Sequence, residues 1–246
     1  MAAPPEPSCR LGVLAFGDSI TNGGGELQWG VALQSWALWT ARGLGLPYTS
    51  YARDGARAAD VVRDQITALA AQAPAGARYD LGCVYVGVND VRALDWDAAG
   101  FARDHAEALR ALAARCDRVL AVTIPLDLGR PRAGATVEEG NAIIADNARL
   151  GGALMLDLRD FGARNLLMPD HVHPTAFGQV AIAERALAVL AGDGMAVRVR
   201  PSSLVSYETT RWKRLRGDAT YAYRHAKVST RAAWIRARVA AGLPVA

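Results

Sequence analysis

Short apolar runs alternate with longer stretches of helical periodicity along most of this chain, and this alternation limits the possible folds more than any other feature. Four runs have the length and composition of buried strands: residues 11–16, 81–86, 118–124 and 153–158. Residues 47–51 are a fifth strand candidate with a weaker apolar pattern. In the other stretches apolar residues recur every three or four positions, as on one face of a helix: residues 28–42, 60–72, 101–115, 137–149 and 176–191. The alternation predicts an α/β fold with a parallel sheet covered by helices on both faces.

Candidate functional residues follow the predicted strands. Ser19 follows the first strand, Gly55 the second and Asn89 the third, and residues 170–173 follow the last. Ligands of parallel α/β sheets bind beyond the carboxyl ends of the strands. We therefore expect these residues to converge at one edge of the sheet.

Ser19 lies in the segment Phe16-Gly17-Asp18-Ser19-Ile20-Thr21, directly after the first predicted strand. A serine at a sharp turn from strand to helix exposes its hydroxyl at the carboxyl edge of the sheet. The alternative is a plain turn, because Gly, Asp and Ser all favour turns. The local sequence alone leaves both interpretations open.

Two further segments carry polar side chains that suit acyl chemistry. Asn89 can donate its amide to a developing oxyanion, although an Asn-Asp pair is also typical of a helix cap. A serine nucleophile needs a neighbouring base, which His173 can supply while Asp170 orients its ring. His171 is a rival base, and Asp170, His171 and His173 together could also bind a metal ion.

Together these segments resemble the SGNH (GDSL-like) serine hydrolase/esterase family over roughly residues 10–192. The matching blocks are Gly17-Asp18-Ser19, Gly87-x-Asn89-Asp90 and Asp170-x-x-His173-Pro174. The resemblance implies a three-layer α/β/α sandwich of flavodoxin-like topology with a five-stranded parallel sheet. It implies no cofactor and no metal.

The resemblance also implies a role for each site residue. Ser19 would be the nucleophile, His173 the general base and then acid, and Asp170 its orienting partner. The oxyanion hole would consist of the Ser19 backbone N–H, the Gly55 N–H and the Asn89 side chain. The implied activity is hydrolysis of an ester or acyl group through an acyl-enzyme on Ser19, on a small-molecule, lipid or carbohydrate ester. An acyltransferase with the same triad and a non-catalytic polyanion-binding protein are the alternatives.

Several residues near these blocks have expected roles outside the chemistry. We expect Asp18 and Asp90 to hold loops through backbone hydrogen bonds. Trp36 and Trp39 have helical spacing and are expected in the core. Trp29 follows a glycine-rich segment beside the serine and is a candidate for substrate contact.

The N-terminal sequence and the cysteines bear on location. The first residues have neither the basic stretch nor the apolar run of a secretory signal, and no stretch is apolar enough to span a membrane. The three cysteines, Cys9, Cys83 and Cys116, are odd in number and widely spaced, which favours reduced thiols. We therefore expect a cytoplasmic protein.

Charge divides the chain in two. Residues 1–196 carry 17 Lys and Arg against 22 Asp and Glu, a net charge of −5, whereas residues 197–246 carry 11 against 2, a net charge of +9. We predict a hydrolase domain over residues 1–196 and a basic C-terminal arm over residues 197–246.

The arm interleaves its basic residues with five large aromatics: Tyr207, Trp212, Tyr221, Tyr223 and Trp234. Because such side chains favour burial, we expect the arm to dock on the hydrolase body or on a second subunit, which would make a homo-oligomer. The alternative is a tail that binds a polyanion or an anionic membrane surface. We expect no nucleic-acid partner.

Overall fold

The computed structural model describes residues 10–25, 31, 33–128, 134–163, 165–205 and 210–241. Five parallel strands form one sheet in the order β2-β1-β3-β4-β5. The strands are β1 (Val13–Gly17), β2 (Tyr48–Ser50), β3 (Tyr79–Tyr85), β4 (Cys116–Val122) and β5 (Leu154–Leu156). All five predicted strands are present, with ends that differ by a few residues.

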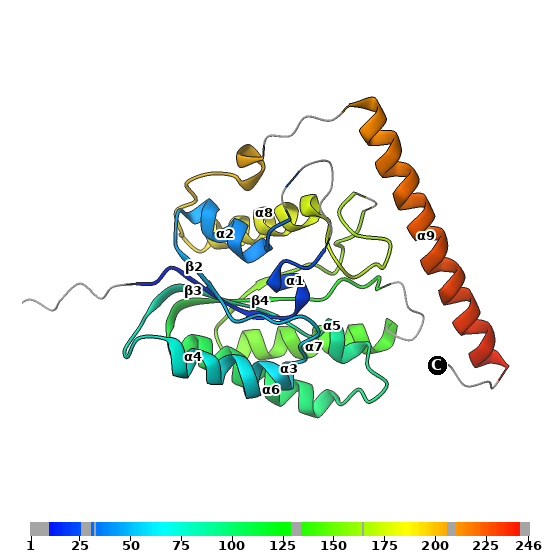
Figure 1. The fold of residues 1–246 in the computed structure, drawn as a ribbon. Coiled ribbons are helices and arrows are strands. Elements are labelled where there is room, and N and C mark those ends of the chain that lie inside the picture. The colour runs from blue at the N-terminus through cyan, green and yellow to red at the C-terminus, as the bar shows by residue number, and fades with distance from the viewer. Residues whose placement is uncertain are drawn as a thin grey trace, which may run out of the picture.

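Helices cover both faces of the sheet (Figure 1). One face carries α2 (Trp36–Leu44) and α8 (Ala176–Gly192). The other carries α6 (Ala98–Ala113), α7 (Gly134–Leu150) and a helical segment over residues 58–72. The three-layer α/β/α sandwich that the resemblance implied is confirmed.

The segment over residues 58–72 is a single run of helix with an irregular centre. It comprises α3 (Ala58–Asp60), the π-helical turn η1 (Val61–Ile66) and α4 (Thr67–Gln72). A π turn shifts the side chains that follow it around the helix axis, and a repeat of three or four residues does not predict it.

The predicted helix over residues 28–42 was too long at its N-terminal end. Within the described residues α2 begins at Trp36, because the Ser35 hydroxyl accepts a hydrogen bond from the Ala37 N–H and caps the helix there. Trp36 and Trp39 are buried as predicted. The indole of Trp36 packs edge-on against Tyr85 of the sheet.

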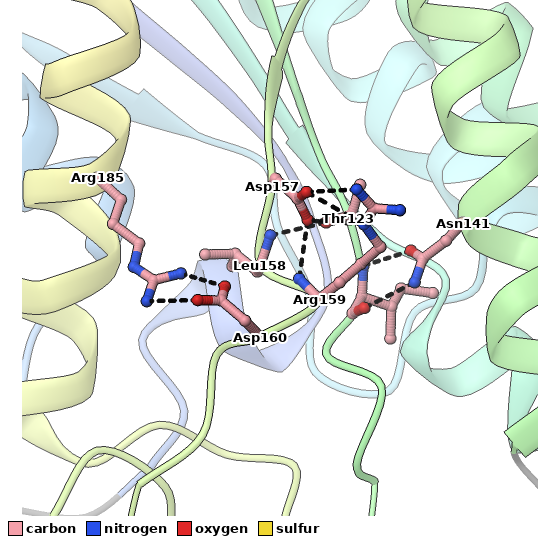
Figure 2. A network of polar contacts seen from close by, with 8 residues as sticks. Thr123, Asn141, Asp157, Leu158, Arg159, Asp160 and Arg185 are labelled. Atoms are coloured by element: carbon pink, nitrogen blue, oxygen red, sulfur yellow. Dashed lines mark hydrogen bonds and ion pairs between the residues drawn. The ribbon is translucent and has the colours of Figure 1, made fainter.

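Polar side chains fix the chain where β4 and β5 end (Figure 2). The Asn141 amide accepts from the N–H of Ile124 and donates to its carbonyl, at 2.7 and 2.8 Å. The Thr123 hydroxyl donates to Asp157 and accepts from the Leu158 N–H. These bonds hold the two loops at the carboxyl edge of the sheet, where the predicted site lies.

The predicted C-terminal arm has two parts in the structure. Residues 197–205, which include η2 (Pro201–Leu204), lie against α2 and α8, and the N–H groups of Arg198 and Val199 donate to the Gly43 carbonyl. Beyond them, α9 (Arg211–Ala240) runs along one side of the molecule, outside the three layers (Figure 1). No helix among the described residues is long and apolar enough to cross a membrane.

Burial of the arm's aromatics on the chain's own body is found only in part. Trp212, Tyr223 and Trp234 are exposed, Tyr221 is half-buried, and Tyr207 lies outside the described residues. The body therefore leaves one side of α9 uncovered, and docking on a second subunit stays a prediction.

Candidate active site

Ser19 is the first residue of α1 (Ser19–Asn22), which begins immediately after β1. The backbone turns tightly at Gly17, where a Cβ would lie 2.5 Å from the Tyr85 carbonyl oxygen. Only glycine fits so close an approach. Asp18 caps the short helix, since its carboxylate accepts from the Ile20 N–H at 2.9 Å. These features set the Ser19 side chain at the carboxyl edge of the sheet.

The side-chain amide of the buried Gln65 binds the backbone of this turn. Gln65, on the π turn η1, accepts from the Gly17 N–H at 2.9 Å and donates to the Gly17 carbonyl at 2.7 Å. Gln179 of α8 binds the residues that follow Ser19, because its amide donates to the carbonyls of Ile20 and Gly24.

Sequence reasoning missed both glutamines. The available signal was position, because Gln65 stands four residues after Val61 and four before Leu69, on a helix face that is otherwise apolar. A polar side chain on a buried face needs a hydrogen-bond partner, and here the partner is the nucleophile turn.

Ser19, His173 and Asp170 form a continuous hydrogen-bonded chain. The Ser19 Oγ lies 2.9 Å from His173 Nε2, and His173 Nδ1 lies 2.7 Å from Asp170 Oδ2. The other carboxylate oxygen of Asp170 accepts from the N–H groups of Val172 and His173. Residues 154 positions apart in the sequence thus meet with the geometry that base-assisted nucleophilic attack requires.

The electrostatics of this pair suit a base. The hydrogen bond that His173 donates to Asp170 raises the pKa of His173 above 6.5, against the opposing effect of burial. Burial alone would raise the pKa of Asp170, but the hydrogen bonds from His173 and the backbone outweigh it and lower the pKa below 3.8. Asp170 therefore stays ionised near neutral pH and stabilises the imidazolium.

The predicted oxyanion residues lie on neighbouring loops. Gly55 follows β2 with φ of 75°, and no atom lies within 4 Å of the position that a Cβ would take. Asn89 lies in α5 (Val88–Val91), just after β3, and its amide donates to the Ala56 carbonyl at 3.0 Å. This bond ties the Asn89 side chain to the loop that carries Gly55.

Two acidic residues brace the loops, as predicted. Asp90 accepts from the Ala58 N–H, and Asp18 accepts from the Ile20 N–H. Burial raises the pKa of Asp18 to about 7 and that of Asp90 to about 6.

His171 pairs with another carboxylate. It has a left-handed backbone, with φ of 59°, and its Nδ1 lies 3.3 Å from Asp127 Oδ2. The position of His173 between Ser19 and Asp170 favours His173 as the base. Among the described residues, no group of three or more His, Cys, Asp or Glu side chains could hold a metal ion.

The structure adds one residue to this region that the sequence did not suggest. The ring of His225, on α9, lies 6.1 Å from the ring of His171, and Tyr221 stacks on His225 at 6.0 Å. Nothing in the local sequence of the arm pointed to this contact. Trp29, the predicted substrate contact, lies outside the described residues.

Solved structures of two hydrolases share this fold. An acetylxylan esterase from Geobacillus stearothermophilus aligns with a TM-score of 0.57 at 19% identity, over 78% of this chain and 100% of that one. The alpha/beta hydrolase LAE5 from the metagenome of Lake Arreo, Spain, aligns with a TM-score of 0.57 at 19% identity, over 73% and 94%. Solved variants of the acetylxylan esterase with a serine or an aspartate replaced by alanine are described as catalytic mutants.

Sequence comparison gives the family. No curated protein matches the chain. The model of the GDSL-like Lipase/Acylhydrolase family matches residues 15–181, which is more than half of the chain and includes the blocks around Ser19, Asn89 and His173. The chain therefore belongs to the GDSL-like lipase/acylhydrolase family and is an SGNH-type serine esterase.

Proposed function

We propose that this esterase cleaves its substrate through an acyl-enzyme on Ser19. The observation that carries the proposal is the hydrogen-bonded chain from Ser19 through His173 to Asp170. The Ser19 oxygen attacks the ester carbonyl while its proton passes to His173 Nε2. The tetrahedral intermediate then collapses, and His173 returns that proton to the departing alkoxide.

The second half of the cycle uses the same groups. A water molecule gives a proton to His173 and attacks the acyl carbonyl, and the carboxylic product leaves as Ser19 regains its proton. In both halves the oxyanion lies against the N–H groups of Ser19 and Gly55 and the amide of Asn89. An amide has two N–H bonds, so Asn89 can donate to Ala56 and to the oxyanion together.

For the substrate we propose a small acyl group, such as acetyl, on a carbohydrate or other small alcohol. The fold shared with an acetylxylan esterase supports this class. An acyltransferase would use the same acyl-enzyme with another alcohol in place of water. It is distinguished by product analysis in the presence of an added alcohol acceptor.

The first prediction tests the nucleophile. Ser19→Ala should abolish hydrolysis of p-nitrophenyl acetate and labelling by a fluorophosphonate, with a loss of several orders of magnitude in kcat. An unchanged melting temperature would show that the fold is intact. Activity within tenfold of wild type would exclude the acyl-enzyme, and a series of longer p-nitrophenyl esters and acetylated sugars would define the acyl group.

A cytoplasmic location is also a proposal. Cys83 and Cys116 are free and buried, and burial raises the pKa of Cys116 to about 12, which keeps its thiol protonated and unreactive. Reduced thiols suit the cytoplasm. Cell fractionation with an antibody to the chain would test the location.

A further inference from the structure

The two sides of α9 differ in what they contact. On one side Tyr221 and His225 lie at His171 of the body. On the opposite side, Trp212 is 72% exposed, Tyr223 69% and Trp234 50%. With 100° per residue these three and Leu215 fall within an arc of about 100°, centred nearly opposite Tyr221. We call Trp212, Leu215, Tyr223 and Trp234 the outer aromatic face.

Basic side chains border this face along its whole length. Within Arg211–Ala240, Lys and Arg number nine and Asp and Glu one, so the helix carries a net charge of +8. Exposed cations lie on both borders of the outer aromatic face: Arg216, Lys227 and Arg231 along one border, and Arg211 and Arg236 along the other. Between the large side chains the face carries mostly alanine.

We infer that α9 is an interfacial helix that binds an anionic lipid surface through its outer aromatic face. A helix of low mean hydropathy, with Trp and Leu on one side and Lys and Arg around them, lies in the plane of a lipid interface. Trp and Tyr are favoured at that level because their rings are apolar and their N–H or O–H groups reach water. The cations then meet the lipid phosphates.

The shape of the face argues against other occupants. Trp212 and Trp234 are separated by about 33 Å along the axis, at 1.5 Å per residue. A lipid interface accepts aromatics on such a straight line without preformed pockets. A nucleic acid duplex would meet the cations through its phosphates but leave the aromatics in water. Two α9 helices would repel each other because each carries +8.

The contact between His225 and His171 places α9, and with it the outer aromatic face, near the catalytic residues. His171 is two residues from His173, and its ring meets His225 on the inner side of α9. A lipid surface bound to the outer side would therefore lie beside the loop that carries the base. The esterase would be held at an anionic membrane with its active-site edge close to it.

Cosedimentation of the full chain with vesicles tests the inference. We expect binding to vesicles of phosphatidylglycerol and phosphatidylcholine, weakened by salt, and little binding to pure phosphatidylcholine. The triple variant Trp212→Ala/Tyr223→Ala/Trp234→Ala should bind at least tenfold more weakly. The matched control Leu94→Ala/Leu150→Ala, which removes exposed leucines of the body, should bind like wild type.

Further measurements keep the result interpretable. The triple variant and the leucine control should keep wild-type hydrolysis of p-nitrophenyl acetate, which shows that the body is folded. Ser19→Ala should still bind vesicles, so that failure of the proposed chemistry and failure of this inference are separable. Absence of anionic vesicle binding would overturn the inference. So would a dimer in a sizing run that the triple variant dissociates, or binding of the triple variant to anionic vesicles that equals that of wild type.

Discussion

Among the site's carboxyl groups, Asp18 has the pKa that burial raises most. It is fully buried, one carboxylate oxygen has no hydrogen-bond partner among the described atoms, and burial raises its pKa to about 7. The folded state therefore binds a proton more tightly than the unfolded chain, whose carboxyl has a pKa near 3.8. The stabilisation from this carboxyl is complete below pH 4 and is lost as the pH rises through about 7.

Asp18→Asn should remove this pH dependence. The amide oxygen of Asn can still cap Ile20, so we expect the variant to gain stability over wild type as the pH rises from 4 to 8, by on the order of 4 kcal/mol at the upper end. Denaturant unfolding across this range measures the difference. Asp18→Ala lacks the cap and should be about 1 kcal/mol less stable than Asp18→Asn at every pH, with the same pH dependence as that variant. A constant difference between wild type and Asp18→Asn would contradict the buried charge.

His173 should set the acid limb of the rate profile. As a base it must be neutral, and Asp170 raises its pKa above 6.5, so kcat/KM should rise with pH through that raised value. In Asp170→Asn the imidazolium loses its anionic partner. The limb should move to lower pH and kcat should fall by about 10⁴. If the acid limb of the kcat/KM profile stays at the same pH in Asp170→Asn, a group other than His173 controls it.

The sequence predicted residues well where chemistry and spacing coincide. Ser19, Asp170 and His173 were named from short blocks, and the structure joins them by hydrogen bonds. The roles of Gln65 and His225 were not predicted, because each contacts a residue that is distant in the sequence. Gly17 and His171 lie 48 and 54 residues from them, and no local pattern records such a meeting.

Among the elements, the π turn η1 has a direct link to the site. The extra residue in this turn places Gln65 under the nucleophile loop, where it bonds both backbone groups of Gly17. Asn141 of α7 bonds both backbone groups of Ile124 after β4 in the same manner. At two strand ends a buried amide thus binds both the N–H and the carbonyl of one residue, and at Gly17 it does so beside the backbone bond from the Arg53 N–H.

Gln65→Leu should therefore affect turnover more than binding. It leaves the Gly17 N–H buried without its partner, at a cost of roughly 1–3 kcal/mol, while the Gly17 carbonyl keeps only its bond from the Arg53 N–H. A shift of the turn that relieves this cost also moves Ser19. We expect a melting temperature several degrees lower and a kcat reduced at least tenfold with KM little changed. Gln72→Leu, on the exposed side of α4, is the matched control. Equal loss of stability with unchanged kcat would make Gln65 structural only.

Element types followed from the sequence, whereas some ends and irregularities did not. All five strands were predicted, and β1, β3 and β4 gave the clearest signal because strands buried in a parallel sheet are short apolar runs. The start of α2 was placed too early because apolar spacing continues upstream of the Ser35 cap. The π turn was not predicted, because apolar residues every three or four positions indicate a regular α-helix.

At the scale of the whole molecule, the charge boundary after residue 196 and the packing boundary do not coincide. Residues 197–205 carry the basic composition of the arm, yet Pro201 is buried and the Ser202 N–H donates to Glu184 of α8. Composition alone could not separate residues 197–205 from α9, because both are basic. They differ in their contacts, since residues 197–205 pack against α2 and α8 whereas most of α9 is exposed.

Two truncations should therefore behave differently. A chain ending at Ala196 loses residues 197–205 and exposes the faces of α2 and α8 around Gly43, against which Leu187 and the Val199 carbonyl pack closely. We expect its melting temperature to fall by several degrees, since the lost contacts are buried. A chain ending at Val205 loses only α9, whose side chains are mostly exposed, and should melt like the full chain. Melting curves and a sizing run on the three chains measure the difference. If the chain ending at Val205 changes its oligomeric state, the second subunit expected from the sequence is the partner of α9, whereas an early melt alone would mean that the contact of α9 at His171 stabilises the body.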